Sequence, residues 1–164
     1  MAVPIVIVGA TEHIGKAVIA GMQPDYEGIV PNFHTNKGSF LSNPAVILFC
    51  TSIQAASSEI PYILRGEAPP SQSSTIASGN FGAAPKAVVF GGAWSEEDVL
   101  SVQSALQGAR GSEGLVLLMK DAGRPEPPLG PTYGKHIVER VKMTMGEVVG
   151  GRGGEGPHAG VVWY

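Results

Sequence analysis

The sequence predicts a single α/β domain in three layers, with helices on both faces of a mainly parallel β-sheet. Its 164 residues are enough for one domain with a buried core. Short apolar runs recur along the chain, and they are continuous rather than alternating, as in strands covered on both faces. Helical patterns lie between several of these runs, which favours a parallel sheet with right-handed crossovers.

The apolar runs place the strands of this sheet. They are predicted over residues 4–8, 28–33, 45–50, 86–91 and 115–119. Ligands of such sheets bind outside the carboxyl ends of the strands. We therefore expect functional residues at positions 9–13, 33–36, 91–95 and 120–123.

The first helix is predicted over residues 12–23. Its apolar residues Ile14, Val18 and Met22 share one face, and Pro24 marks its end. The chain therefore starts with a strand, a tight glycine turn and a helix.

Another helix begins at Ser95, in the stretch SEED. This stretch offers a serine N-cap and three acids that suit the positive end of the helix dipole. Val99 and Leu106 fall on one face, and Gly108 supplies a C-cap. A last helix is predicted over residues 133–149, where it should cover one face of the sheet.

Two neighbouring segments lack a clear pattern. Residues 66–85 are rich in Pro, Ser, Gly and Ala and predict a long loop, which in a compact domain is either functional or mobile. A lid over the edge of the sheet is one interpretation. The preceding stretch IPYILRG fits a short strand or one helical turn, and the sequence leaves both open.

The predicted domain covers residues 1–149, followed by a glycine-rich linker and apolar tail over residues 150–164. The final VVWY is expected to dock on the domain's own core or on a second subunit. Only 15% of the residues are charged, against about 25% in a typical soluble domain. The tail and the charge-poor surface together predict a homodimer.

Composition excludes several classes of partner. The net charge is −3 and there is no lysine or arginine run, so neither nucleic acid nor an anionic membrane surface is expected. The single Cys50 cannot form an internal disulfide, and the amino terminus lacks the pattern of a secretory signal. No apolar run approaches the roughly 18–20 residues that cross a bilayer. We predict a soluble, cytoplasmic protein.

The stretch VIVGATEHIG resembles the first strand, turn and helix of the NmrA-like proteins, atypical short-chain dehydrogenase/reductases with the pattern GATGxxG. Gly9, Thr11 and Gly15 match this pattern. The resemblance implies a shortened Rossmann-like domain in which these three residues bind NAD(P). Glu12 stands where the family has its middle glycine, and it adds bulk and negative charge beside the expected pyrophosphate.

Two further tests concern the cofactor. The end of the predicted second strand, VPNFHTNKG, has no acid for a ribose hydroxyl and only Lys37 as a loose candidate for a phosphate. The Tyr-x-x-x-Lys pair of short-chain dehydrogenases is absent, because Tyr133 and Lys135 have the wrong spacing. The prediction is that no cofactor is bound, with NADP as the alternative.

Candidate catalytic residues lie near the strand ends. Glu12 and His13 begin the first helix, where the helix dipole suits an acid and favours a neutral imidazole that can act as a base. His34 ends the predicted second strand and could face His13. Asp121 and Tyr133 flank a proline-rich loop and are a candidate proton acceptor and donor. A helix cap, a surface histidine and solvated charges are the structural alternatives. No paired Cys or His spacing predicts a metal site.

Three functions remain open. The first is a cofactor-free acid–base enzyme, an isomerase, cyclase or lyase, that acts on a small apolar metabolite in secondary metabolism or another biosynthetic route. The second is an NAD(P)-dependent oxidoreductase. The third is a non-catalytic binding or regulatory module of the NmrA-like kind.

Overall fold

Five strands form one parallel sheet in the computed structural model, which describes residues 3–22, 44–152 and 156–164. The strands are β1 (Val3–Val8), β2 (Pro44–Cys50), β3 (Ala87–Phe90), β4 (Val116–Met119) and β5 (Val161–Trp163). They lie in the order β2-β1-β3-β4-β5, and every neighbouring pair is parallel. The predicted α/β class is confirmed.

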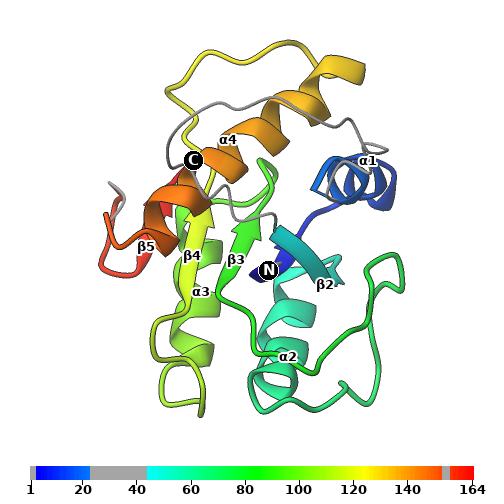
Figure 1. The fold of residues 1–164 in the computed structure, drawn as a ribbon, viewed down its shortest axis with the longest axis vertical. Coiled ribbons are helices and arrows are strands. Elements are labelled where there is room, and N and C mark those ends of the chain that lie inside the picture. The colour runs from blue at the N-terminus through cyan, green and yellow to red at the C-terminus, as the bar shows by residue number, and fades with distance from the viewer. Residues whose placement is uncertain (1–2, 23–43, 153–155) are drawn as a thin grey trace, which may run out of the picture.

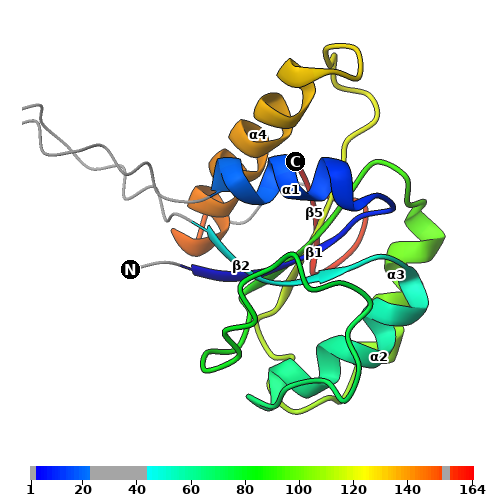
Figure 2. The ribbon, with the colours of Figure 1, turned by 90° about the vertical axis from the view of Figure 1, so that its right-hand side faces the viewer.

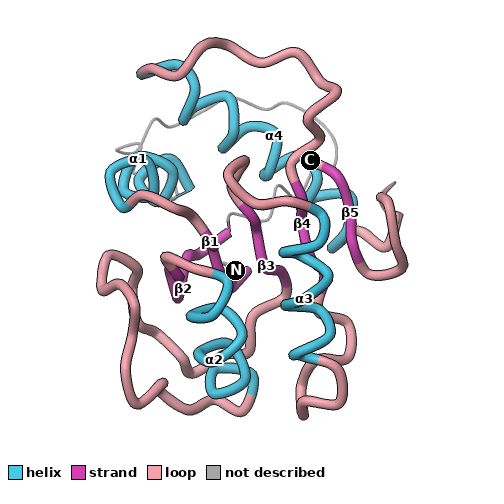
Figure 3. Tube along the Cα trace, turned by 180° about the vertical axis from the view of Figure 1, so that it is seen from behind, coloured by secondary structure: helices cyan, strands magenta, loops and turns pink. Residues whose placement is uncertain are grey.

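Four helices complete the three layers. They are α1 (Glu12–Met22), α2 (Ile53–Leu64), α3 (Glu96–Leu106) and α4 (Pro131–Val149). Figures 1 and 2 show α1 and α4 on one face of the sheet, and Figure 3 shows α2 and α3 on the other. Each face buries its own apolar cluster against its two helices. The domain is therefore Rossmann-like in its layering.

Local sequence explains where the elements begin. The apolar residues of β3 are all buried, as expected for a strand covered on both faces. Ser95 caps α3 through a capping box with Asp98. Ser52 caps α2, because its side chain accepts the N–H of Ala55 at 3.0 Å. The stretch IPYILRG, which the sequence left open, largely belongs to α2 and carries Pro61 inside it.

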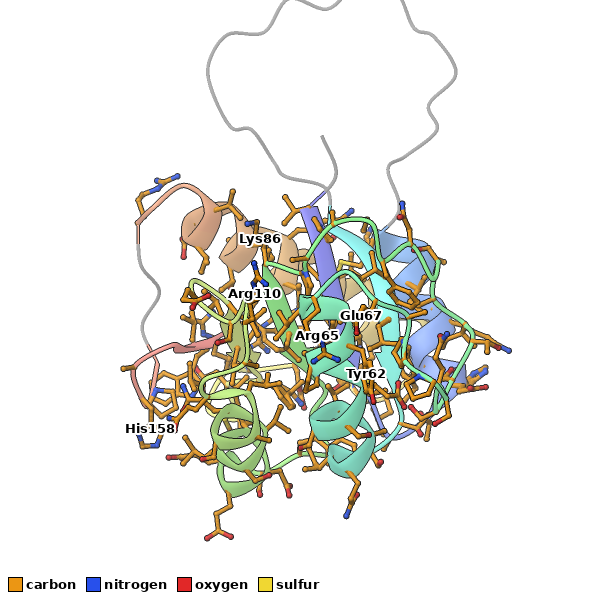
Figure 4. The ribbon with its side chains drawn as sticks, turned by 90° about the horizontal axis from the view of Figure 1, so that it is seen from below. Tyr62, Arg65, Glu67, Lys86, Arg110 and His158 are labelled. Carbon is orange, nitrogen blue, oxygen red and sulfur yellow. The ribbon has the colours of Figure 1, made fainter. Side chains whose placement is uncertain are left out.

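The strand register aligns the carboxyl ends of all five strands. Val8 pairs with both Cys50 and Phe90, Phe90 with Met119, and Met119 with Trp163. The next residues along the chain therefore stand in one row at this carboxyl edge: Gly9, Thr51, Gly91, Lys120 and Tyr164. Figure 4 shows the molecule from the opposite side, where Arg65, Lys86 and Arg110 lie.

The loop over residues 66–85 covers the outer edge of the sheet. The main-chain N–H of Ser78 donates to the carbonyl of Val46 at 3.2 Å, and that of Gly79 donates to the carbonyl of Ile47 at 3.1 Å. Both carbonyls belong to the edge strand β2. This placement agrees with the interpretation of the loop as a cover for the sheet edge.

Two other predicted segments differ in their outcome. The predicted strand over residues 28–33 lies outside the described residues, and β2 pairs directly with β1. The final VVWY docks on the domain's own sheet, because Val161–Trp163 form β5 and Tyr164 is buried. No helix within the described ranges is both long and apolar enough to cross a membrane.

Candidate functional site

A cavity of about 440 Å³ lies at the carboxyl edge of the sheet, where it is lined by residues of α1, of α4 and of the turns after β1 and β3. After β1 the chain enters α1 on one face of the sheet, and after β3 it enters α3 on the other face (Figure 2). Ligands of open α/β sheets bind at such a switch in direction. The cavity therefore has the usual position of a ligand site in this architecture.

The cavity walls are mostly apolar. Ile7, Phe49 and Val89 of the sheet line its floor, and Ile137 of α4 adds to its side. Leu129, in the loop before α4, also lines the cavity and is 76% exposed. A large exposed apolar side chain beside an apolar cavity indicates a binding surface for a ligand with apolar parts.

The glycines of the GATEHIG stretch bring the backbone close to Phe49. A Cβ atom at Gly15 would lie 2.5 Å from Phe49 Cε2, and one at Gly9 would lie 2.9 Å from Phe49 Cζ. Both glycines and Thr11 line the cavity. The turn therefore needs glycine to pack on the aromatic ring beneath it, whatever ligand the cavity takes.

Three side chains form a polar cluster in the cavity. Lys120 Nζ lies 2.7 and 2.5 Å from the two carboxylate oxygens of Glu126. The same Nζ donates to the phenol oxygen of Tyr133 at 3.3 Å. The Lys120 and Glu126 side chains are only 13% and 33% exposed. The cluster therefore places an ion pair and a phenol against the apolar walls.

Lys120 stays protonated in this setting. Burial disfavours the charged form, but the hydrogen bonds to Glu126 and Tyr133 outweigh it and raise the pKa of Lys120 above its ordinary value. The ammonium group is therefore a fixed positive charge at neutral pH. It can stabilise negative charge that develops on the phenol of Tyr133.

Tyr164 also lines the cavity, but its hydroxyl does not act as a proton donor to a ligand. Its hydroxyl donates to the carbonyl of Phe90 at 2.7 Å, and Arg140 of α4 donates to its main-chain carbonyl. Burial raises the pKa of the Tyr164 phenol well above its usual range. With its proton committed to Phe90, this phenol cannot exchange protons with a ligand.

The structure places Glu12 and His13 outside the cavity lining. Both are exposed, and the Glu12 carboxylate accepts the hydroxyl of Ser74 at 2.5 Å. Ser74 belongs to the loop over residues 66–85 and is 5% exposed. Glu12 therefore fastens this loop to the start of α1.

Of the remaining predicted catalytic residues, Tyr133 lines the cavity and Asp121 does not. The Asp121 carboxylate instead accepts the N–H of Gly123 at 2.9 Å and pairs with Arg124 at 3.1 Å, so it shapes the loop after β4. His34 lies outside the described residues. Its expected approach to His13 therefore stays a prediction.

Sequence reasoning missed the roles of Lys120, Glu126 and Tyr164. Side chains alternate between the two faces of a strand. Leu118 belongs to the cluster under α1 and α4, so Lys120 continues this face beyond β4 and Asp121 does not. The same alternation places Tyr164 on the cavity side after β5. No comparable sequence signal identifies Glu126, which reaches Lys120 through the fold of the loop.

The end of β2 is held by the loop over residues 66–85. In a dinucleotide-binding sheet the adenosine ribose lies at the end of the strand beside β1, which here is β2. There the N–H of Thr51 donates to the Ser73 hydroxyl at 3.2 Å, and the Ser73 N–H donates to the buried carboxylate of Glu59 at 2.7 Å. These two hydrogen bonds hold the loop over residues 66–85 at the end of β2.

Metal ligands are not assembled in the part of the chain that the structure describes. No group of three or more His, Cys, Asp or Glu side chains there could hold a metal ion. The Cys50 thiol is buried and lies 3.7 Å from the Glu59 carboxylate, on the face of the sheet away from the cavity. Its burial raises the pKa of the thiol well above its usual range.

Comparison with known proteins gives one similarity and no family. No model of a protein family matches the chain. The chain is similar to Kojic acid related protein 6 of Aspergillus oryzae (strain ATCC 42149 / RIB 40), with 28% identity over 148 residues. The matched region covers 90% of this chain and 78% of that protein. No solved structure matches.

Proposed function

We propose that the protein is a cofactor-independent enzyme that transfers protons on a small, largely apolar metabolite, as an isomerase, cyclase or lyase. The observation that carries this proposal is the contact between Lys120 Nζ and the Tyr133 phenol, 3.3 Å apart in the cavity at the carboxyl edge. A phenol held by an ammonium group can give a proton to a substrate oxygen.

Each polar residue has a distinct role. Tyr133 accepts a hydrogen bond from Lys120, which leaves its own hydroxyl proton free to donate to a carbonyl oxygen of the substrate. When the proton moves, the negative charge left on the phenol lies beside the Lys120 ammonium. Glu126 holds Lys120 in position through both carboxylate oxygens. Water then takes the carbon-bound proton next to the polarised carbonyl, which gives the enol. Reversal of both transfers returns a solvent proton to carbon and the hydroxyl proton to Tyr133.

The apolar walls strengthen this chemistry. Charges interact more strongly where few water molecules intervene, so a phenolate and an ammonium attract each other more in this cavity than in solution. Phe49 and Ile137 also provide apolar surface for the carbon skeleton of the substrate. The cavity thus combines a hydrophobic binding surface with one proton donor.

The similarity to Kojic acid related protein 6 supports a substrate among small metabolites. The name links that protein to kojic acid, so we place the present chain in secondary metabolism and biosynthesis. We also propose that it acts in the cytoplasm, and as a homodimer on the ground of its charge-poor composition alone, because the VVWY tail belongs to the sheet of its own domain. Neither proposal is needed for the chemistry of the cavity.

Solvent deuterium exchange tests the proposal directly. The full-length protein is incubated in D2O, without cofactor, with a panel of small ketones and enols that includes kojic acid, and deuterium at carbon is followed by NMR. At least one compound should exchange faster with protein. Tyr133→Phe should slow this exchange by about 100-fold or more. Tyr62→Phe is the matched control, because Tyr62 lies on α2 and contacts Arg65 rather than the cavity.

An NAD(P)-dependent reductase is the second candidate, favoured by the contact of a tyrosine and a lysine beside the glycine turn after β1. Calorimetric titration with NADPH and NADH separates the two. Micromolar binding, about −8 kcal/mol, would favour the reductase. If neither exchange nor nucleotide binding is observed, while small compounds still bind, the chain is a binding or regulatory module.

A further inference from the structure

The charges inside the cavity balance one another. Among the described residues that line it, Lys120 and Glu126 are the charged ones, and they are paired. Outside the lining, Asp121 pairs with Arg124, Glu12 accepts from the neutral Ser74, and the buried Arg140 donates to the main-chain oxygen of Tyr164. A ligand in the cavity therefore meets one ion pair in the lining itself.

The Glu126 carboxylate lies directly against the Lys120 ammonium group, with its two oxygens 2.7 and 2.5 Å from Nζ. An ammonium group has three donors, and two of them are used, by Glu126 Oε1 and by the Tyr133 hydroxyl at 3.3 Å. The aliphatic stem of Lys120 is largely buried, which restricts the position of the ammonium group.

We propose that Glu126 makes the cavity selective for uncharged ligands. A carboxylate or phosphate that approached Lys120 would come close to the Glu126 carboxylate, and the two anions would repel each other strongly beside apolar walls. A neutral carbonyl or hydroxyl meets no such repulsion and can accept a hydrogen bond from Tyr133. This inference rests on the proposed function, because it assigns the substrate class of the same cavity.

Two probes of matched shape measure this selectivity. The ketone 2-acetylnaphthalene and the anion 2-naphthoate share one fused-ring skeleton, suited to an apolar cavity of about 440 Å³. Their affinities for the full-length protein at neutral pH are measured by NMR titration. The wild-type protein should bind the ketone at least about tenfold more tightly than the carboxylate.

Glu126→Gln should remove the preference for the ketone. The amide keeps the size of the side chain and removes its charge, so Lys120 becomes available to an anion. We expect the affinity for 2-naphthoate to rise at least about tenfold relative to the affinity for the ketone. Glu139→Gln is the matched control, because it makes the same charge change on α4 at a side chain that is 61% exposed and outside the cavity.

A double variant assigns the gain to Lys120. Lys120→Met added to Glu126→Gln should abolish the new affinity for 2-naphthoate. The inference is overturned if the wild-type protein prefers the carboxylate, or if Glu126→Gln leaves the carboxylate affinity unchanged. If neither probe binds any variant, the inference falls together with the proposed function. If selectivity is observed without deuterium exchange, the proposed catalysis fails alone.

Discussion

Gly15 has no room for a side chain, because Phe49 lies directly beneath it. An added Cβ would come within 2.5 and 2.6 Å of two ring carbons and 3.1 Å of Ile76 Cδ1. Phe49 is fully buried, so its ring cannot move aside into solvent. The resemblance to the GATGxxG pattern assigns this glycine to a cofactor-binding turn. In the structure its first role is to let α1 pack on the sheet.

Gly15→Ala should therefore destabilise the fold. Overpacking of this kind costs about 1–3 kcal/mol, which urea denaturation can measure. Gly146→Ala in α4 is the contrasting variant, since an added Cβ there meets nothing within 4 Å. It should stabilise the protein by about 0.5–1 kcal/mol, because alanine has the higher helix propensity. Equal effects at the two positions would contradict the packing argument.

Single residues of the site were partly predictable. Tyr133 was identified because it follows a strand-end loop, and it does line the cavity. Asp121 was named as a candidate proton acceptor, whereas alternation along β4 points its neighbour Lys120 toward α4. Glu12 was expected at the sheet mouth, but its partner Ser74 lies 62 positions away along the chain. Such long-range contacts leave no local sequence pattern.

At the scale of elements, the loop over residues 66–85 depends on two carboxylates. Glu12 accepts the hydroxyl of Ser74, and Glu59 accepts the N–H of Ser73. These contacts hold the loop against the start of α1 and the end of β2.

Ser74→Ala should loosen this loop. The variant loses a buried hydroxyl that donates to Glu12 at 2.5 Å, so we expect a stability loss of about 1 kcal/mol. Hydrogen exchange should accelerate at Ser78 and Gly79, whose N–H groups bond to β2. Ser71→Ala, at an exposed position of the same loop, is the control. Unchanged exchange in Ser74→Ala would show that Glu12 does not hold the loop.

The helix α2 shows why one element could not be predicted. Proline lacks an N–H and usually breaks a helix interior, so IPYILRG was equally compatible with a strand. The structure keeps Pro61 inside α2, where Ile60, Ile63 and Leu64 are buried against the sheet. Tertiary packing thus stabilises a helix that local propensity does not favour.

At the scale of the whole molecule, the parallel sheet followed from continuous apolar runs, but the strand order did not. Periodicity shows that a strand is covered on both faces and does not identify its neighbours. The register that brings Gly9, Gly91, Lys120 and Tyr164 into one row is set by pairing between distant segments. The cavity is a product of this register, so its position could be predicted only as an edge of the sheet.

Two buried groups make the free energy of unfolding depend on pH in the alkaline range, because they keep their protons in the folded protein. Burial raises the pKa of the Cys50 thiol and of the Tyr164 phenol above their usual ranges. In the unfolded chain both groups ionise at ordinary values, about 8.5 and about 10. The folded protein therefore binds more protons than the unfolded chain above these values, so its stability falls as pH rises.

The free energy of unfolding, measured by urea denaturation from pH 7 to pH 11, should decrease in two stages. Each group contributes a slope of about 1.4 kcal/mol per pH unit once it is ionised in the unfolded chain. Cys50→Ala should reduce the slope of the free energy of unfolding against pH above about pH 8.5. Tyr164→Phe should flatten the stage above about pH 10 and also lower stability at pH 7 by about 1 kcal/mol, because the bond to Phe90 is lost. If both variants keep the wild-type slope, these two groups are not the ones that hold protons in the fold.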